Sequence, residues 1–259
     1  LAVLVVYLFW KSLGIFKRSR TIVWGLFLLT ISPWLFFYSR IGYEISLGFL
    51  FFCLSAYFLW LSLKKKIFLV WALGLMSLSF YAAHFQVLLA PLLVVSFAVL
   101  FQDRLVRKEV FRYCLVGGLL AGLILIPYLF FSDADLLVNK GGHFYGEAIF
   151  EQAEKIKFLP KLISVPMALV REFLARYFAY FSPRSLFFEA DPDFQRSIPG
   201  LSVFYFWMVV PYLIGLYELW KLRSEKYGKY VWLLLLLAPV SAALTKDPFA
   251  THRAIPLLL

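Results

Sequence analysis

Two side chains of opposite charge, Arg40 and Glu44, stand where two long apolar runs meet, within the stretch YSRIGYE. On a continuous helix, a spacing of four places both side chains on one face. One interpretation is an interfacial salt bridge, or an arginine whose charge extends to the lipid headgroups. The other is a functional pair, in which Arg40 binds an anionic headgroup and Glu44 contacts a sugar or an acceptor. Tyr43 lies between them and is a candidate substrate contact.

A second polar group lies in LTKDPFATHRAIP, just before another apolar run. Lys246, His252 and Arg253 gather positive charge within eight residues, and Asp247 adds a carboxylate beside them. Arginine and lysine are common ligands of phosphate, so this segment is a candidate anion site. Ordinary binding of lipid headgroups is the alternative. A third candidate is His84 in FYAAHF, where a tight-turn histidine bonded to the backbone is the simpler interpretation.

No motif of a soluble enzyme accompanies these residues. The sequence has no phosphate-binding P-loop, no HExxH and no GxSxG. The three histidines lack the spacing of metal ligands, so no metal site is predicted. The sequence indicates no cofactor and does not decide whether a divalent metal is required.

Composition indicates which elements must position the polar clusters. Of the 259 residues, 63% are hydrophobic and 20% are aromatic, whereas a soluble domain is about half apolar. Apolar runs of 16 to 20 residues recur, long enough to cross a hydrocarbon core of roughly 30 Å. The spans must be helices, because lipid cannot satisfy an open backbone. The sequence therefore predicts an all-α, polytopic transmembrane helix bundle.

The net charge of +11 is distributed in a pattern typical of membrane proteins rather than of proteins that bind nucleic acid. Fifteen of the 26 lysine and arginine residues fall in four short segments. Short basic loops are signals for the cytoplasmic side of a membrane, so nucleic acid is not an expected partner, and membrane lipids are. The four segments are residues 11–20, 64–66, 104–112 and 221–229.

The basic segments alternate with other connections, and this alternation orients about eight predicted spans. Residues 40–43, 82–85, 132–198 and 245–253 then lie on the non-cytoplasmic side, together with all three polar clusters. Within the long loop, residues 160–181 have the periodicity of an amphipathic helix in the membrane interface. The predicted spans are 1–10, 21–39, 43–63, 67–82, 85–101, 113–131, 199–220 and 230–244.

One membrane domain accounts for the chain. Its helices lie in 1–131 and 199–259, and 132–198 forms the outer loop between them. Leu1 and the final IPLLL both stand inside apolar runs, so we expect truncation at both ends, and a signal peptide cannot be assessed.

Three segments, in order along the chain, resemble motifs of one family. They are SPWLFFYSRIGYEISLGFLFF, YFSPRSLFFEADPDFQRSIPGLSVFYFWMVVPYLIGLYEL and APVSAALTKDPFATHRAIPLL. In them the chain is similar to the polytopic glycosyltransferases of the C superfamily. More narrowly, it resembles the bacterial branch related to dolichyl-phosphate-mannose–protein mannosyltransferases and to lipid A aminoarabinose transferases. It departs from the family pattern at Ala190, where a glycine is common, and at Leu201 and Ser202, in a second glycine region.

The resemblance implies a sugar donor linked to polyprenyl or dolichyl phosphate. The sugar would pass, with inversion, to a protein, lipid or glycan acceptor on the outer face of a bacterial plasma membrane. Cations would stabilise the leaving phosphate, and a carboxylate would deprotonate the acceptor hydroxyl. Arg253 or Lys246 would be the phosphate ligand, and Glu44 a second acidic residue at the site. The principal catalytic aspartate of the family would lie upstream of Leu1.

Two other functions would use the same residues. A transporter or flippase for an anionic lipid-linked solute needs ionisable groups at mid-membrane depth, and the predicted spans are almost free of charge. A structural subunit of an envelope complex would show no dependence on Arg40 or Arg253. A catalytic acid in an upstream outer loop would favour the transferase.

Overall fold

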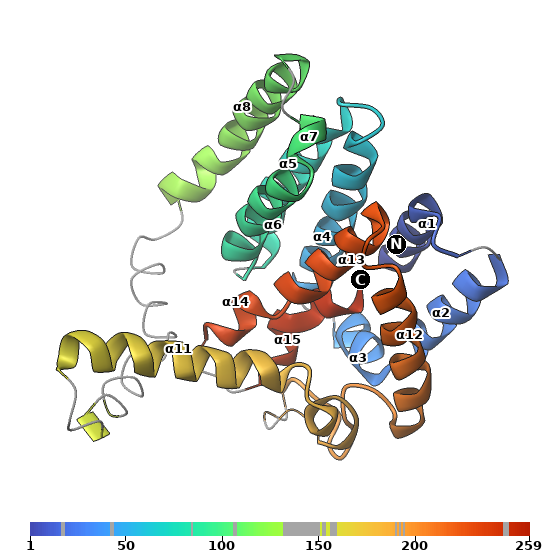
Figure 1. Ribbon diagram of the computed structural model, residues 1–259, viewed down its shortest axis with the longest axis vertical. Coiled ribbons are helices and arrows are strands. Elements are labelled where there is room, and N and C mark those ends of the chain that lie inside the picture. The colour runs from blue at the N-terminus through green and yellow to red at the C-terminus, as the bar shows by residue number, and fades with distance from the viewer. Residues whose placement is uncertain are drawn as a thin grey trace.

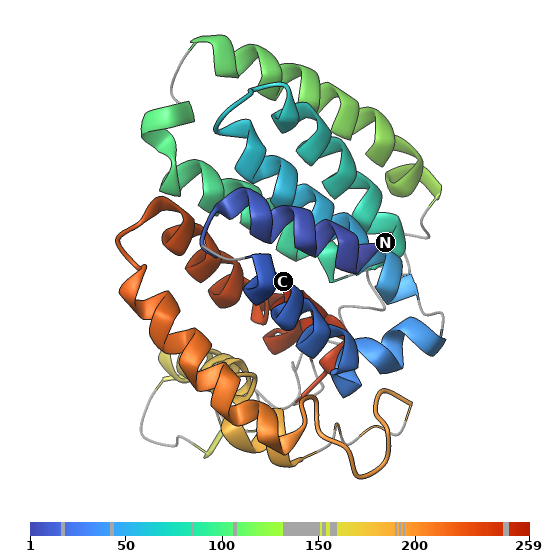
Figure 2. The same ribbon diagram turned by 90° about the vertical axis from the view of Figure 1, so that its right-hand side faces the viewer.

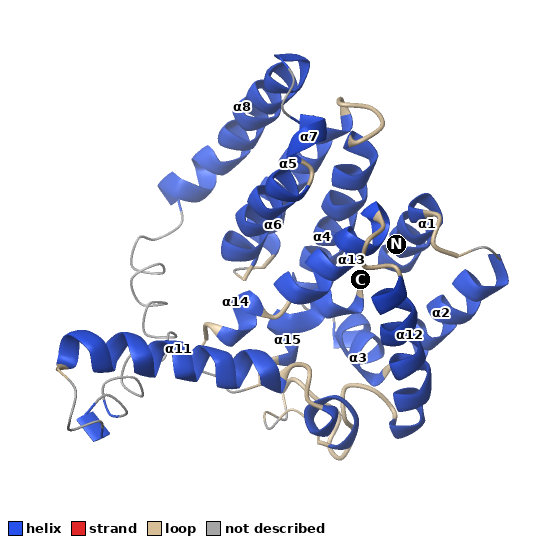
Figure 3. Cartoon of the chain, viewed as in Figure 1, coloured by secondary structure: helices blue, strands red, loops and turns tan. Residues whose placement is uncertain are grey.

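The computed structural model of the chain describes residues 1–16, 19–41, 44–83, 85–105, 108–131, 151, 154–155, 160–189, 191, 193, 195–245 and 249–259. These residues form helices and loops, and no strand occurs among them (Figure 3). The α-helices are α1 (Ala2–Leu13), α2 (Ser19–Ile31), α3 (Pro33–Ile41), α4 (Glu44–Ser62), α5 (Phe68–Ala82), α6 (Gln86–Leu100), α7 (Gln102–Leu105), α8 (Lys108–Phe131), α11 (Lys161–Ala179), α12 (Val209–Lys221), α13 (Lys226–Leu237), α14 (Val240–Ala243) and α15 (Thr251–Ala254). Three short turns of other helix types are η1 (Arg184–Phe188), η2 (Phe206–Met208) and η3 (Ile255–Leu258).

Two helices in the described part of the chain are long and apolar enough to cross a membrane. They are α4, over Glu44–Ser62, and α8, over Val110–Phe130. The pair α2 and α3 makes a third if it is one span bent by 60°. Helices α1, α5 and α6 are apolar but only 12 to 15 residues long. The all-helical prediction is confirmed, whereas the helices that meet the length criterion are fewer than the predicted eight spans.

The bend between α2 and α3 has a local cause at Pro33. Proline lacks a backbone N–H and its ring clashes with the carbonyl four residues back, but it suits the first position of a helix. Helix α2 therefore ends at Ile31 and α3 begins at Pro33. The freed backbone groups find other partners, because the Trp34 N–H donates to the Val203 carbonyl at 3.2 Å and the Ser32 hydroxyl donates to the Leu29 carbonyl at 2.7 Å.

Two predicted spans near the C-terminal end need correction. The span 199–220 begins too early, because Gly200 has a φ of 77°, a left-handed conformation typical of a glycine turn, and helix appears only from η2 onward. The span 230–244 is divided, because α13 ends two residues before Pro239 and α14 begins after it. Proline again prevents the helix from continuing.

Helices α4 and α8 differ greatly in burial although both are strongly apolar. Half of the most apolar window of α4 is buried, against 6% for α8. Helix α4 lies in the core, where the hydroxyl of buried Tyr230 on α13 donates to its Ala56 carbonyl at 2.8 Å. Helix α8 forms the outermost layer and packs chiefly on α5 (Figure 2).

The helices run between two ends of the molecule. One end carries α7, the turn between α4 and α5, and the start of α8 (Figure 1). The other end carries α3, α11, α14 and α15, which are distant in sequence (Figure 1). The polar segments around α3 and α15 are thereby brought to the same end.

Helix α11 is present where the amphipathic helix was predicted. It presents an exposed apolar stripe at spacings of three and four residues, formed by Ile163, Met167, Val170, Leu174 and Phe178. Its opposite face packs on α14. Glu172 is also largely enclosed, and its carboxylate accepts from Arg176 at 2.7 Å. The location of α11 in a membrane interface stays a prediction.

Candidate functional site

Helices α3 and α15 are joined directly by hydrogen bonds. The Tyr38 hydroxyl lies 2.8 Å from the Thr251 hydroxyl, and the Trp34 indole N–H donates to the Thr251 carbonyl at 3.1 Å. All three side chains are buried. These contacts join positions more than 200 residues apart, so the segments that carry YSRIGYE and THR meet in the fold.

A buried carboxylate, Asp191, organises this junction. It comes from the loop after η1, is 4% exposed, and meets Thr251 through one oxygen. That oxygen, Oδ2, accepts from the Thr251 hydroxyl at 2.8 Å and from the Thr251 N–H at 3.1 Å. The other oxygen, Oδ1, accepts from the Asp193 N–H at 3.0 Å. Buried carboxylates require such donors, and here the donors fix the start of α15 against the loop.

The hydrogen-bond chain at the junction has a defined direction. An ionised carboxylate only accepts, so the Thr251 hydroxyl donates to Asp191. The single Tyr38 proton then lies between two acceptors, the Thr251 hydroxyl oxygen at 2.8 Å and the Arg196 carbonyl at 3.0 Å, and these two oxygens share it. Helix α3, the 191–197 loop and α15 are thus connected through consecutive hydrogen bonds.

The loop that supplies Asp191 is stabilised by its own side chains. The Asp193 carboxylate accepts from the Gln195 N–H at 2.9 Å and pairs with the Arg196 guanidinium at 2.9 Å. The Ser197 hydroxyl donates to the Asp191 carbonyl at 3.0 Å. Aspartate and serine commonly replace missing backbone partners in turns, which explains how a non-helical loop is held at this end of the bundle.

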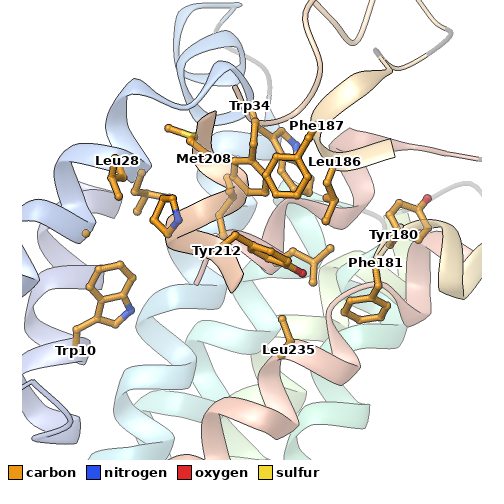
Figure 4. Close-up of a pocket in the computed structure, with 16 residues that line it drawn as sticks. Trp10, Leu28, Trp34, Tyr180, Phe181, Leu186, Phe187, Met208, Tyr212 and Leu235 are labelled. Carbon is orange, nitrogen blue, oxygen red and sulfur yellow. The ribbon is translucent and has the colours of Figure 1, made fainter. Parts of the chain in front are cut away.

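Beside the polar junction lies an apolar cavity of about 250 Å³. In Figure 4, Trp34 and Phe187 stand at one end, Leu235 at the other, and the Tyr212 ring lies between them. The rings of Phe187 and Tyr212 meet edge to face, with centroids 5.4 Å apart. Gly25 and Trp10 line another side of the cavity. A Cβ at Gly25 would lie only 2.8 Å from the Trp10 ring, so a side chain there would displace that ring.

Trp34 is shared by the cavity and the polar junction. Its ring lines the apolar cavity and also a small recess that Tyr38, Asp191 and Thr251 line as well. Tyr180, at the end of α11, makes a second connection, because it lines the cavity while its hydroxyl accepts from the Ala250 N–H at 2.8 Å. An apolar chain in the cavity would therefore end beside buried polar groups.

The structure corrects the relation expected between Arg40 and Glu44. They were expected on one face of one helix, but Arg40 lies near the end of α3 and Glu44 begins α4. Both side chains are exposed, and in the described part of the chain no ion pair joins them. The Arg40 guanidinium instead lies over the Phe36 ring, 4.8 Å from its centroid. The two side chains therefore belong to different helices.

The remaining predicted site residues divide into two groups. His252 and Arg253 follow Thr251 in α15 and are half-buried, so they lie directly beside the polar junction. Tyr43, His84, Lys246 and Asp247 lie outside the residues that the structure describes. Convergence of all these side chains on one ligand stays a prediction. Among the described residues, no group of three histidine, cysteine or acidic side chains is arranged for a metal ion.

Sequence reasoning did not identify Asp191 as a site residue. The available signal was an aspartate in LFFEADPDF, directly after an aromatic, apolar stretch. Glu189 and Asp193 offered equal candidates in the same nine residues, and Glu189 turns out to be an exposed partner of Arg184. Only burial distinguishes Asp191 from them.

Comparison of the chain with protein-family models, with curated proteins and with solved structures gives no match.

Proposed function

We propose that this chain is part of a membrane glycosyltransferase that moves a sugar from a polyprenyl- or dolichyl-phosphate donor to an acceptor on the non-cytoplasmic face, with inversion. The observation that carries the proposal is that one side chain, Trp34, lines an aromatic cavity and also contacts a buried polar junction. A lipid-phosphosugar joins an apolar chain to a polar, charged head. Such a donor requires an apolar surface and a polar surface side by side.

The donor chain would enter the cavity lined by Trp34 and Tyr212. At about 250 Å³, the cavity is smaller than the roughly 300–1,000 Å³ of typical small-molecule sites. It therefore suits part of a long isoprenoid, with the rest of the chain in the bilayer. The aromatic lining favours an unsaturated hydrocarbon through dispersion.

Arg253 is the proposed ligand of the donor phosphate, with Arg40 as a second cation from α3. Phosphate leaving from the sugar gains negative charge, and cations placed beforehand stabilise that charge in the transition state. Asp191 would act on the reaction through Thr251, because it fixes the start of the helix that carries Arg253. Glu44 remains the candidate carboxylate for the acceptor side.

The membrane topology belongs to the same proposal. Helices α1, α4, α5, α6, α8, α12 and α13, together with α2 and α3 as one bent span, would make eight crossings. The basic loops would face the cytoplasm. Single cysteines at Lys65 and Glu154 should then react with impermeant thiol reagents from opposite faces. Labelling of both positions from one side would contradict the topology.

Photolabelling with a short polyprenyl phosphate that carries a diazirine on its chain tests the function. The protein in lipid nanodiscs should be labelled on peptides that contain Trp34 or residues 204–212. Unlabelled polyprenyl phosphate should compete, and polyprenyl alcohol of equal length should compete poorly. Labelling elsewhere, or equal competition by the alcohol, would refute the proposed donor site.

Substitution of Arg253 tests the role of the cation. A charge-assisted hydrogen bond contributes roughly 1.5–3 kcal/mol, so Arg253→Ala should weaken use of the donor by about ten- to a hundredfold. Arg253→Lys should recover only part of that loss, because lysine lacks the two-pronged geometry of arginine. The matched control is Arg171→Ala, an exposed arginine on α11 at the same end of the molecule. Equal effects of both alanine variants would exclude a specific phosphate contact.

A further inference from the structure

A second cavity, of about 490 Å³, lies towards the end of the molecule that carries the basic segments 64–66 and 104–112. Four helices and the short α7 contribute to it, and its lining is apolar apart from one thiol. Phe111 is 70% exposed and Ala98 is also exposed, so the cavity reaches the molecular surface. Representative lining residues are Leu59 of α4, Leu73 of α5, Phe97 of α6, Leu105 of α7 and Cys114 of α8.

Two arginines are direct sequence neighbours of residues that line this cavity. Arg104 precedes Leu105, Arg112 follows Phe111, and both arginine side chains are exposed. The two basic segments meet, because the Lys66 ammonium donates to the Arg104 carbonyl at 3.3 Å. Lys64 and Lys65 are exposed in the same turn, and the exposed carboxylate of Asp103 offsets only part of this charge.

Helix α8, which lines one side of the cavity, exposes apolar side chains on the outer surface of the molecule. Only 6% of the apolar window of α8 is buried. Its outward face is a row of leucine and isoleucine, including Leu115, Leu119, Leu123 and Ile126. In a bilayer this face contacts acyl chains, so lipid tails lie beside the cavity opening.

We propose that this cavity binds an anionic phospholipid, with one acyl chain among the apolar side chains and the headgroup phosphate among the described cations Lys64, Lys65, Arg104 and Arg112. Basic pockets between membrane helices favour anionic headgroups, and the apolar lining excludes a free phosphate as the main ligand. The inference goes beyond the proposed function. It depends on the membrane location of the chain and not on sugar transfer.

The test compares two lipids that share acyl chains and differ in headgroup charge. The protein, purified in detergent, is titrated with phosphatidylglycerol or phosphatidylcholine, and bound lipid is counted by native mass spectrometry. Phosphatidylglycerol should bind more tightly. The double variant Arg104→Gln and Arg112→Gln should lower its affinity by about thirtyfold and lower that of phosphatidylcholine less, because choline offsets the phosphate charge of that lipid.

Two further variants separate a built site from general surface charge. Lys11→Gln with Arg20→Gln removes the same charge from exposed positions on α1 and α2, which lie away from α8 (Figures 1 and 2). It should leave phosphatidylglycerol affinity unchanged. Ala98→Trp fills the cavity from an exposed lining position and should weaken binding of both lipids.

Equal affinity for the two lipids, an equal effect of both double variants, or full binding to Ala98→Trp would each overturn the proposal. Sugar transfer and photolabelling by a polyprenyl phosphate do not involve this cavity. Equal affinity of the parent protein for the two lipids, with sugar transfer and photolabelling as proposed, would therefore refute only this inference.

Discussion

At the end that carries α3 and α15, distant segments are joined by side-chain hydrogen bonds, whereas α5 and α8 are joined by close approach of their backbones. At the first place Tyr38, Asp191 and Thr251 connect two helices and a loop. At the second, a Cβ on Gly117 would lie only 3.2 Å from the Val70 Cα. The two kinds of contact differ because α5 and α8 are both helical where they meet, whereas the contact at the other end includes a loop.

A helix satisfies its own backbone, so a pair of helices needs only complementary shape, and small residues allow close contact in a membrane. A loop leaves backbone N–H and carbonyl groups without partners inside the chain, and these groups must find side chains. The polar junction is therefore a consequence of non-helical structure at one end. It also supplies the polar groups that a ligand head would require.

The largest expected effect is at Asp191. Asp191→Ala leaves the Thr251 N–H, the Thr251 hydroxyl and the Asp193 N–H without their buried acceptor. Each unsatisfied group costs about 1–3 kcal/mol, and partial rearrangement should leave a total loss of about 2–4 kcal/mol in the free energy of unfolding. Denaturant titration in detergent micelles measures it.

Glu189→Ala is the matched control for Asp191→Ala. Glu189 lies two residues away, and its half-exposed carboxylate pairs with exposed Arg184 at 2.6 Å. Surface ion pairs contribute about 0–1 kcal/mol, so this variant should remain close to the parent. If both variants lose equal stability, the buried junction is not the element that holds this end together.

The helix contact between α5 and α8 should respond to Gly117→Leu. The added side chain would meet Leu73 at 2.8 Å and the Val70 backbone at 3.2 Å, so the helices must separate. Overpacking of this kind costs about 1–3 kcal/mol. Gly118→Leu is the control on the neighbouring residue, where nothing lies within 4 Å of a Cβ. Leucine favours a helix more than glycine does, so a loss of stability at Gly118 as large as at Gly117 would show that the close contact at Gly117 does not decide the effect.

The smallest effect is expected at Tyr81, whose hydroxyl makes side-chain hydrogen bonds in the otherwise apolar contact between α5 and α8. Its hydroxyl donates to the Ile124 carbonyl and accepts from the Tyr128 N–H at 3.0 Å, so it enters the backbone ladder of α8 beside Pro127. Tyr81→Phe should cost about 0.5–1.5 kcal/mol.

Tyr128→Phe serves as the control for Tyr81→Phe, because it retains the ring contact with Tyr81, whose centroid is 5.4 Å away. Both variants are compared by thermal unfolding. If Tyr81→Phe unfolds at the wild-type temperature, the Ile124 carbonyl and the Tyr128 N–H do not need the Tyr81 hydroxyl for stability.

Helix type and location were readable from the sequence because they depend on local properties. Long apolar runs must be helical in lipid, and α4, α5, α6 and α8 lie within a few residues of their predicted spans. The break at Pro33 and the interruption at Pro239 are also local, since both follow from the missing N–H of proline. A closer interpretation of the prolines would have predicted them.

The candidate site was predictable only in part. The meeting of the YSRIGYE and THR segments was expected from a shared side of the membrane, and α3 and α15 do meet through Tyr38 and Thr251. The i,i+4 relation of Arg40 and Glu44 failed because a helix boundary intervenes between them.

The helical class, the apolar runs and the grouping of polar residues near helix ends can be predicted from the amino-acid sequence alone, because each depends on neighbouring residues and on the solvent. Which apolar helix is buried depends on tertiary packing, since α4 and α8 have similar mean hydropathies, 1.9 and 2.1, but differ greatly in burial. Tertiary packing also decided that Asp191 is enclosed while Glu189 is exposed. Burial is a property of the packed chain, because the atoms that exclude water from Asp191 come from α3 and α15, far away in sequence.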